Sequence, residues 1–142
     1  MDPIRTALLS FGMSGRVFHA PFIQHHPGFE LAGSWERSKN VLRDHYPAAR
    51  RYEAFEDILD DPAVDLVVVN TPTLTHFDFA RDALQAGKHV VVEKAFAGDA
   101  AEAAELRDLA RENDLRLAVF QNRRWECDFL SVRYVMAQGS VG

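Results

Sequence analysis

Two glycines in the segment from Ser10 to Gly15 have a spacing that suits phosphate binding. Gly12 and Gly15 stand where the second and third glycines of G-x-G-x-x-G belong, directly after an apolar run typical of a strand. Backbone N–H groups near Gly12 can approach a pyrophosphate at a helix N-terminus, and Gly15 lets that helix pack closely on the strand. A purely structural turn is the alternative, since Ser10 replaces the first glycine. The residues predicted to bind a dinucleotide here are Ser10, Phe11, Gly12, Met13, Ser14 and Gly15.

Glu36 follows the next expected strand, about 20 positions after Gly15, which is the spacing of the acid that binds the adenosine ribose in dinucleotide folds. A carboxylate there accepts hydrogen bonds from the ribose hydroxyls and repels a 2′-phosphate. Arg37 and Ser38 come next and could instead hold that phosphate. An ordinary solvated turn is a further interpretation. The sequence therefore predicts NAD or NADP as cofactor, with NAD slightly favoured.

Other polar motifs follow expected strands farther along the chain. They are Thr71-Pro72 with His76, Glu93-Lys94, and Asn122-Arg123-Arg124-Trp125 with Asp128-Phe129. Together with the stretch from Gly12 to His19, these motifs resemble the glucose–fructose oxidoreductase/inositol dehydrogenase (Gfo/Idh/MocA) family of NAD(P)-dependent oxidoreductases, over essentially the whole chain. The last motif is most similar to the branch that includes scyllo-inositol dehydrogenases and related sugar oxidoreductases.

The resemblance implies a catalytic role for Lys94. The family motif Glu-Lys-Pro supplies a lysine beside the nicotinamide, and here Ala95 replaces the proline, so the geometry of this loop is left open. An ammonium at a strand end can hydrogen-bond the substrate hydroxyl and favour its alkoxide as hydride leaves. Taken by itself, a lysine at a strand terminus is commonly just a surface residue.

The resemblance also implies which other residues contact the ligands. From the residues alone, His76 is equally a hydrogen-bonding residue at a helix start, and the two arginines are equally solvated. Cofactor contacts are implied for Asn70, Thr71, Pro72, His76, Glu93, Lys94, Asn122 and Arg123, and substrate contacts for Lys94, Arg124 and Trp125.

The elements that would position these residues follow from the apolar pattern, which switches between short continuous runs and helical periodicity. Strands are expected at residues 4–9, 29–35, 51–52, 66–69, 89–93 and 115–120. Helices are expected from Gly15 toward residue 25, at 38–46 capped by Ser38, at 55–59, from the Thr75 cap to Gly87, from the Asp99–Glu102 capping box to 113, and at 129–137. This alternation predicts an α/β fold, a Rossmann doubly wound parallel sheet of about six strands with helices on both faces.

Composition narrows the class of partner. The formal net charge of −5 argues against a broad nucleic-acid surface and offers no polybasic segment for a membrane. No apolar run approaches the roughly 20 residues that span a bilayer. The single cysteine, Cys127, cannot form an internal disulfide and favours a cytoplasmic location. The adjacent His25 and His26 diverge, so no metal site is predicted.

Domain organisation is a further implication of the family. A family enzyme continues into a second α/β domain that forms the substrate pocket and typically supplies the proton-accepting histidine. We therefore expect an NAD(P)-binding domain at residues 1–138, a stub of the turn into that domain at 139–142, and an absent C-terminal substrate domain. Such a chain should bind cofactor weakly and turn over little or no sugar or polyol.

The last expected helix, at residues 129–137, is apolar on too many faces for a helix with one side in water. It predicts an exposed apolar patch with self-association or poor local order. A stand-alone nucleotide-binding module or one chain of a split oxidoreductase is the alternative function. An S-adenosylmethionine methyltransferase shares the early glycine turn and acid but does not explain the later motifs.

Overall fold

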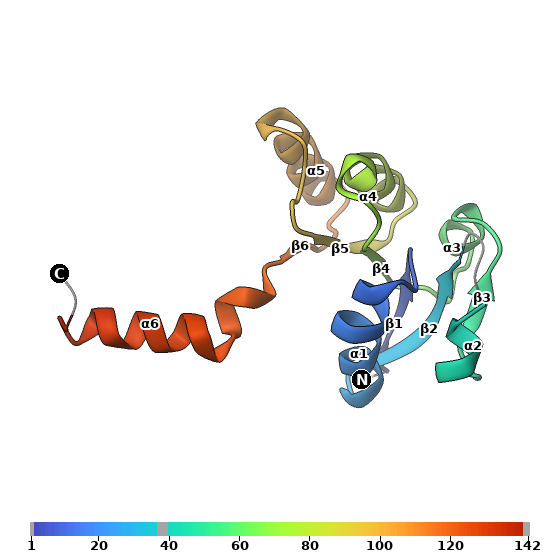
Figure 1. The fold of residues 1–142 in the computed structure, drawn as a ribbon. Coiled ribbons are helices and arrows are strands. Elements are labelled where there is room, and N and C mark those ends of the chain that lie inside the picture. The colour runs from blue at the N-terminus through green and yellow to red at the C-terminus, as the bar shows by residue number, and fades with distance from the viewer. Residues whose placement is uncertain (1, 37–39, 141–142) are drawn as a thin grey trace.

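The computed structural model describes residues 2–36 and 40–140, and these form a six-stranded parallel sheet flanked by helices (Figure 1). The strand order is β3-β2-β1-β4-β5-β6, so the direction of winding reverses between β1 and β4. The strands are β1 (Ile4–Leu8), β2 (Phe29–Trp35), β3 (Arg50–Tyr52), β4 (Leu66–Val69), β5 (His89–Glu93) and β6 (Leu117–Phe120). This topology confirms the predicted doubly wound Rossmann fold.

The helices lie on both faces of the sheet, as predicted (Figure 1). They are η1 (Gly15–His19), α1 (Ala20–His25), α2 (Leu42–His45), α3 (Glu56–Leu59), η2 (Thr73–Thr75), α4 (His76–Gln85), α5 (Ala100–Glu112), η3 (Asn122–Trp125) and α6 (Cys127–Ala137). The expected strand at 115–120 begins two residues later, at Leu117. The expected helix at 38–46 is described only as the single turn α2, and its predicted cap Ser38 lies outside the described residues.

Two apolar clusters bury the faces of the sheet. Along β4, Val67 and Val69 join the cluster under α3, α4 and α5, whereas Val68 joins the cluster under α1 and α2. Successive side chains of a strand point to opposite faces, so a strand covered on both sides must be apolar at every position. The uninterrupted run 66–69 is therefore a consequence of the central position of β4.

The predicted helix caps have different outcomes. The Asp99 carboxylate accepts a hydrogen bond from the Glu102 backbone N–H at 2.9 Å, which confirms the predicted cap of α5. Gly87 has a φ of +77°, which ends the turn after α4 as predicted. The predicted Thr75 cap is wrong, although α4 does begin after this residue. Its hydroxyl instead contacts the Thr71 hydroxyl and the Pro72 carbonyl, because η2 folds these residues back beneath it.

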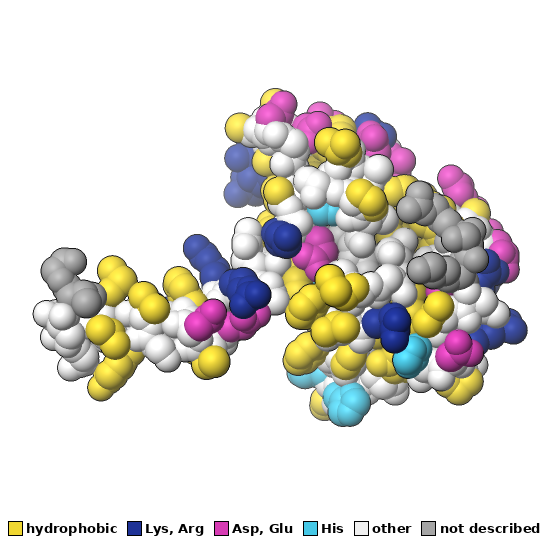
Figure 2. All heavy atoms as spheres, in the orientation of Figure 1, with side chains coloured by type: hydrophobic (Ala, Val, Ile, Leu, Met, Phe, Trp, Pro, Cys, Tyr) yellow, Lys and Arg dark blue, Asp and Glu magenta, His cyan; other side chains and the backbone are white. Residues whose placement is uncertain are grey.

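The helix α6 projects away from the sheet at the end of the β6–η3 connection (Figure 1). None of its residues is buried, and hydrophobic side chains lie on several of its sides (Figure 2). Met136, for example, is 61% exposed. The apolar helix predicted from the sequence is thus present and exposed. Among the described residues, no helix is long and apolar enough to cross a bilayer.

Candidate functional site

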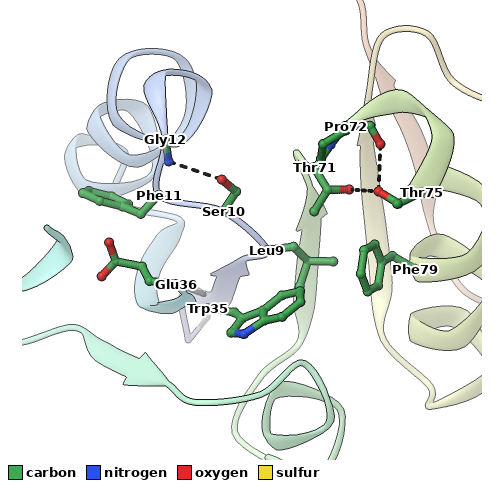
Figure 3. Close-up of a pocket in the computed structure, with 10 residues that line it drawn as sticks. All are labelled: Leu9, Ser10, Phe11, Gly12, Trp35, Glu36, Thr71, Pro72, Thr75 and Phe79. Carbon is green, nitrogen blue, oxygen red and sulfur yellow. Dashed lines mark hydrogen bonds between the residues drawn. The ribbon is translucent and has the colours of Figure 1, made fainter. Parts of the chain in front are cut away.

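A cavity of about 340 Å³ opens at the carboxyl ends of β1, β2 and β4, at the point where the winding of the sheet reverses (Figure 3). Ligands of open α/β sheets bind at this position. It is lined by Leu9, Ser10, Phe11, Gly12, Trp35, Glu36, Thr71, Pro72, Thr75 and Phe79. The structure therefore brings together the glycine turn, the acid after β2 and the Thr-Pro motif.

The turn after β1 is built around close backbone packing. A Cβ on Gly15 would lie 2.3 Å from the Ser10 carbonyl oxygen, so no larger residue fits there. The Asn70 side-chain amide donates to that same carbonyl at 2.8 Å and joins the end of β4 to the turn. The Ser10 hydroxyl accepts a hydrogen bond from the Gly12 N–H at 3.3 Å. Gly15 thus has the packing role predicted for it, and the helix that follows begins as the π-helical turn η1.

The turn has room for a ligand beside Gly12, and a hydrogen-bond acceptor beneath it lacks a partner. Gly12 is open on its outer side, because the nearest atom to an added Cβ is the Ser10 hydroxyl at 3.5 Å. Beneath the turn, the Asn70 Oδ1 atom is buried without a hydrogen-bond partner among the described residues. A buried polar atom left without a partner is expensive, which is consistent with a place where water or a ligand completes the hydrogen bonding.

Glu36 lines the cavity on the side of the glycine turn, with its carboxylate beside Phe11 (Figure 3). The side chain is 5% exposed and accepts hydrogen bonds from the backbone N–H groups of Val41 at 3.0 Å and Leu42 at 3.2 Å. These bonds fix the carboxylate at the start of α2. Arg37 and Ser38, the predicted alternative phosphate ligands, lie outside the described residues.

His76 is buried at the start of α4, with 1% of its surface exposed. Its Nδ1 atom lies 2.7 Å from the Ala95 carbonyl oxygen and its Nε2 atom 2.8 Å from that of Thr71. The ring therefore ties the Thr-Pro segment to the segment that follows β5. It supports the walls of the site rather than lining the cavity.

Glu93 at the end of β5 joins that strand to the glycine turn. Its Oε1 atom accepts from the Ser14 hydroxyl at 2.7 Å and from His19 Nε2 at 2.9 Å. Burial raises the pKa of Glu93, but the hydrogen bonds from Ser14 and His19 together hold it below its ordinary value. Burial lowers the pKa of His19, and the contact with Glu93 opposes that shift only in part.

Lys94 follows directly and is exposed, so its ammonium is available at the same edge of the sheet as the glycine turn. The sequence left the geometry of this loop open, because Ala95 replaces the family proline. In the structure the peptide bond between Lys94 and Ala95 is cis. The hydrogen bond between Ser14 and Glu93 holds the residue before Lys94 against the glycine turn, and the catalytic role of Lys94 stays a prediction.

The Asn-Arg-Arg-Trp segment forms η3, away from the cavity at the switch point. Asn122 donates to Glu126 at 3.2 Å, and Arg123 pairs with Glu126 and Asp128. Trp125 is 79% exposed, and together with Asn122 it lines a separate apolar groove on the α1 side of the sheet. The predicted cofactor and substrate contacts of Asn122, Arg123, Arg124 and Trp125 stay predictions.

Sequence reasoning missed some of the residues at the site. His19 stood in the quoted glycine motif without a role, because its burial beneath Glu93 has no local signal. Phe79 and Leu9 line the cavity, and Phe79 packs edge-on against Trp35 with ring centroids 5.8 Å apart. An apolar residue one helical turn after Thr75 could have suggested a cavity wall.

Comparison with known proteins agrees with this geometry. Residues 4–121 match a family model described as oxidoreductase family, NAD-binding Rossmann fold. The chain is 40% identical over 141 residues to YdgJ of Escherichia coli, which is described as an uncharacterized oxidoreductase. The alignment covers 99% of this chain and 41% of that protein. It is 37% identical to the scyllo-inositol 2-dehydrogenase (NADP(+)) IolW of Bacillus subtilis, over 99% of this chain and 39% of the relative.

A crystal structure of an oxidoreductase-like protein from Bacteroides fragilis has a TM-score of 0.90 and 48% identity, covering 100% of this chain and 44% of that chain. The chain thus spans about 40% of the length of the curated relatives that it matches. The matched residues include the glycine turn, Glu36 and all six strands of the sheet. The chain belongs to the Gfo/Idh/MocA family of oxidoreductases, as its NAD-binding Rossmann domain.

Proposed function

We propose that this chain holds a nicotinamide dinucleotide for hydride transfer at a hydroxyl-bearing carbon of a sugar or polyol. The observation that carries the proposal is the hydrogen bond between Ser14 and Glu93, which joins the phosphate-type turn to the strand end that bears Lys94. The cavity beside the turn has room for the adenosine end of the dinucleotide. The nicotinamide supplies a hydride acceptor or donor when bound.

Different residues of the chain would bind different parts of the dinucleotide and of the substrate. Backbone N–H groups of the turn after Gly12 would hold the diphosphate, and the Glu36 carboxylate would accept from the ribose of the adenosine end. Thr71 and Pro72 form the opposite wall of the cavity. The Lys94 ammonium would donate a hydrogen bond to the substrate oxygen and stabilise the alkoxide left when the hydroxyl proton passes to the histidine expected from the second domain. Hydride would then pass from the carbon of that alkoxide to the dinucleotide, leaving a carbonyl.

For the cofactor itself we favour NAD, since the Glu36 carboxylate is held rigidly by two backbone donors and would repel a 2′-phosphate. The NADP(+) named for IolW points the other way. Titration of the 142-residue chain with NADH and NADPH, followed by nicotinamide fluorescence, distinguishes the two. We expect NADH to bind more tightly, and Glu36→Gln to improve NADPH relative to NADH by about tenfold because the repulsion is removed.

Glu30→Gln is the matched control, because it removes a carboxylate from the opposite, exposed end of β2. It should leave the ratio of the two affinities unchanged. Absence of binding by either dinucleotide would refute the proposed function, and tighter binding of NADPH by the wild-type chain would refute the NAD preference.

The domain boundaries are part of the proposal. We assign residues 1–138 to cofactor binding and 139–142 to the turn into a substrate domain of the kind for which the longer relatives have room. The 142-residue chain should then bind dinucleotide yet turn over few or no polyols. Activity that appears only on mixing with a second chain would support the alternative of a split oxidoreductase. Dinucleotide binding that no added substrate domain converts into activity would support a stand-alone nucleotide-binding module.

Self-association is also proposed. A groove of about 1040 Å³ on the α1 side of the sheet is lined by apolar side chains that include Val17, Phe22, Val68 and Val91. The exposed helix α6 carries apolar side chains on several sides (Figure 2). We assign α6 of a second copy to this groove.

For the location of the protein we propose the cytoplasm, which the single cysteine, Cys127, favours because it cannot form an internal disulfide.

A further inference from the structure

His19 is a buried histidine beside the site to which no function has been given. Its side chain is 4% exposed, and its ring packs on Phe120 at the end of β6 with centroids 4.4 Å apart. Its Nε2 atom lies 2.9 Å from Glu93 Oε1. An ionised carboxylate can only accept hydrogen bonds, so this ring nitrogen carries the hydrogen and donates it to Glu93.

The Glu93 carboxylate collects donors from three places in the chain. Oε1 receives the Ser14 hydroxyl and His19 Nε2, and Oε2 receives the Lys94 backbone N–H at 3.3 Å. Ser14 directly precedes the π-helical turn η1, His19 is the last residue of that turn, and Lys94 begins the loop after β5. One carboxylate therefore fastens the helix start after β1 to the backbone of the predicted catalytic lysine.

This cluster is not arranged for nucleophilic catalysis. Ser14 donates to Glu93 and not to His19, so the histidine cannot take the proton of the hydroxyl. The cluster is also unlike ordinary core packing, because burying a histidine and a carboxylate costs more desolvation free energy than burying apolar residues of similar size. Its geometry suits the holding of two ligand-facing segments at a fixed separation.

We propose that His19 and Glu93 are positioning residues that fix Ser14 and Lys94 relative to each other around the nicotinamide half of the dinucleotide. The proposal rests on the proposed function. Neither residue lines the cavity at the switch point, which is formed by the ends of β1, β2 and β4. The cluster should therefore govern the nicotinamide half of the ligand and leave the adenosine half alone.

Binding of NADH and of AMP, which carries the adenosine end without the diphosphate, to the 142-residue chain separates the two halves. Glu93→Ala removes the acceptor for all three donors, and His19→Phe removes one donor while keeping a ring against Phe120. Each should weaken NADH binding by about tenfold or more and change AMP binding by less than about twofold. The blue shift of bound NADH fluorescence should shrink in parallel, since the nicotinamide is held less firmly.

Two further variants separate positioning from stability. Glu93→Gln keeps an oxygen acceptor and should restore NADH affinity to within about threefold of the wild type. Lys88 directly precedes β5, at the end of the strand opposite to Glu93. Lys88→Met removes the hydrogen bonds that the Lys88 ammonium donates to the Asp61 and Val64 carbonyls. It should lower the melting temperature and leave NADH affinity unchanged in the folded protein.

The outcomes are distinct. Equal weakening of NADH and AMP binding by His19→Phe and Glu93→Ala, or unchanged NADH binding in both, would overturn the positioning role while the wild-type affinity still supports the proposed function. Failure of the wild-type chain to bind NADH would overturn the proposed function itself. If Glu93→Ala does not fold, His19→Phe and Glu93→Gln decide the matter between them.

Discussion

At the scale of single residues, the two glycines after β1 have different physical roles. Gly15 is fixed by packing, because a Cβ there would overlap the Ser10 carbonyl at 2.3 Å. Gly12 has room for a Cβ, since its nearest neighbour would be the Ser10 hydroxyl at 3.5 Å. One glycine is therefore required by the fold, and the other is required only if a ligand approaches the backbone.

Alanine substitutions test this division. Gly15→Ala should destabilise the chain by about 2 kcal/mol, because backbone atoms must move to admit the methyl group. Gly12→Ala should leave the unfolding midpoint in urea near that of the wild type and weaken NADH binding by about tenfold, because the methyl group takes the place of a phosphate oxygen. Equal loss of stability in both variants would contradict the assignment.

At the scale of elements, most of the described helices are short, and side-chain carboxylates accept from backbone N–H groups at the starts of α5 and α2. The longest helix, α5, begins with Asp99 accepting from the Glu102 N–H, and the Glu102 carboxylate accepts from the Gly98 N–H at 2.7 Å. This reciprocal arrangement satisfies two backbone donors at the start of the helix. Glu36 similarly accepts from two backbone N–H groups at the start of α2, so one side chain both orders a helix and lines the cavity.

Removal of the α5 cap should have a measurable effect. Asp99→Ala should lower the free energy of unfolding by about 1 kcal/mol in urea titrations, because the Glu102 N–H loses its acceptor. Asp108→Ala on the same helix removes only an exposed pair with Arg107 and should leave the urea midpoint unchanged. A similar change in both variants would mean that the Asp99 carboxylate is not acting as a cap.

At the scale of the whole molecule, the sheet is covered unevenly. On one face α3, α4 and α5 cover its strands, whereas on the other face α1 and α2 lie over the β1–β3 side and leave the apolar groove over β4, β5 and β6. The exposed α6 extends beyond the sheet (Figure 1). A chain with an apolar groove and an apolar helix of its own is suited to reciprocal pairing with a second copy.

Charges placed on α6 should disrupt that pairing. Val132→Glu with Met136→Glu should convert a dimer to a monomer in light scattering, because carboxylates would have to be buried in the groove. Gln85→Glu with Asn113→Glu adds the same charge at the ends of α4 and α5 and should leave the dimer intact. A wild-type chain that is monomeric at high concentration would rule out the proposed association.

Much of the fold was determined by the sequence by itself. The apolar runs at 66–69 and 89–93, the glycine pair and the Asp99 cap are local patterns whose physical meaning does not depend on distant residues. Glu36 was placed correctly for the same reason, because its distance from Gly15 along one βαβ unit fixes its position at the sheet edge. The Thr75 hydroxyl was misjudged, since a competing carbonyl at Pro72 becomes its partner only in the folded turn.

Only the tertiary structure decided how the distant segments meet. Nothing near His19 in the sequence indicates that its partner is Glu93, and His76 finds Ala95 only once β4 and β5 lie side by side. The outward course of α6 and the uncovered groove are likewise properties of the assembled chain. Hydrogen bonds between residues far apart in sequence depend on strand order and register, which are set by the packing of the entire sheet and not by any local pattern.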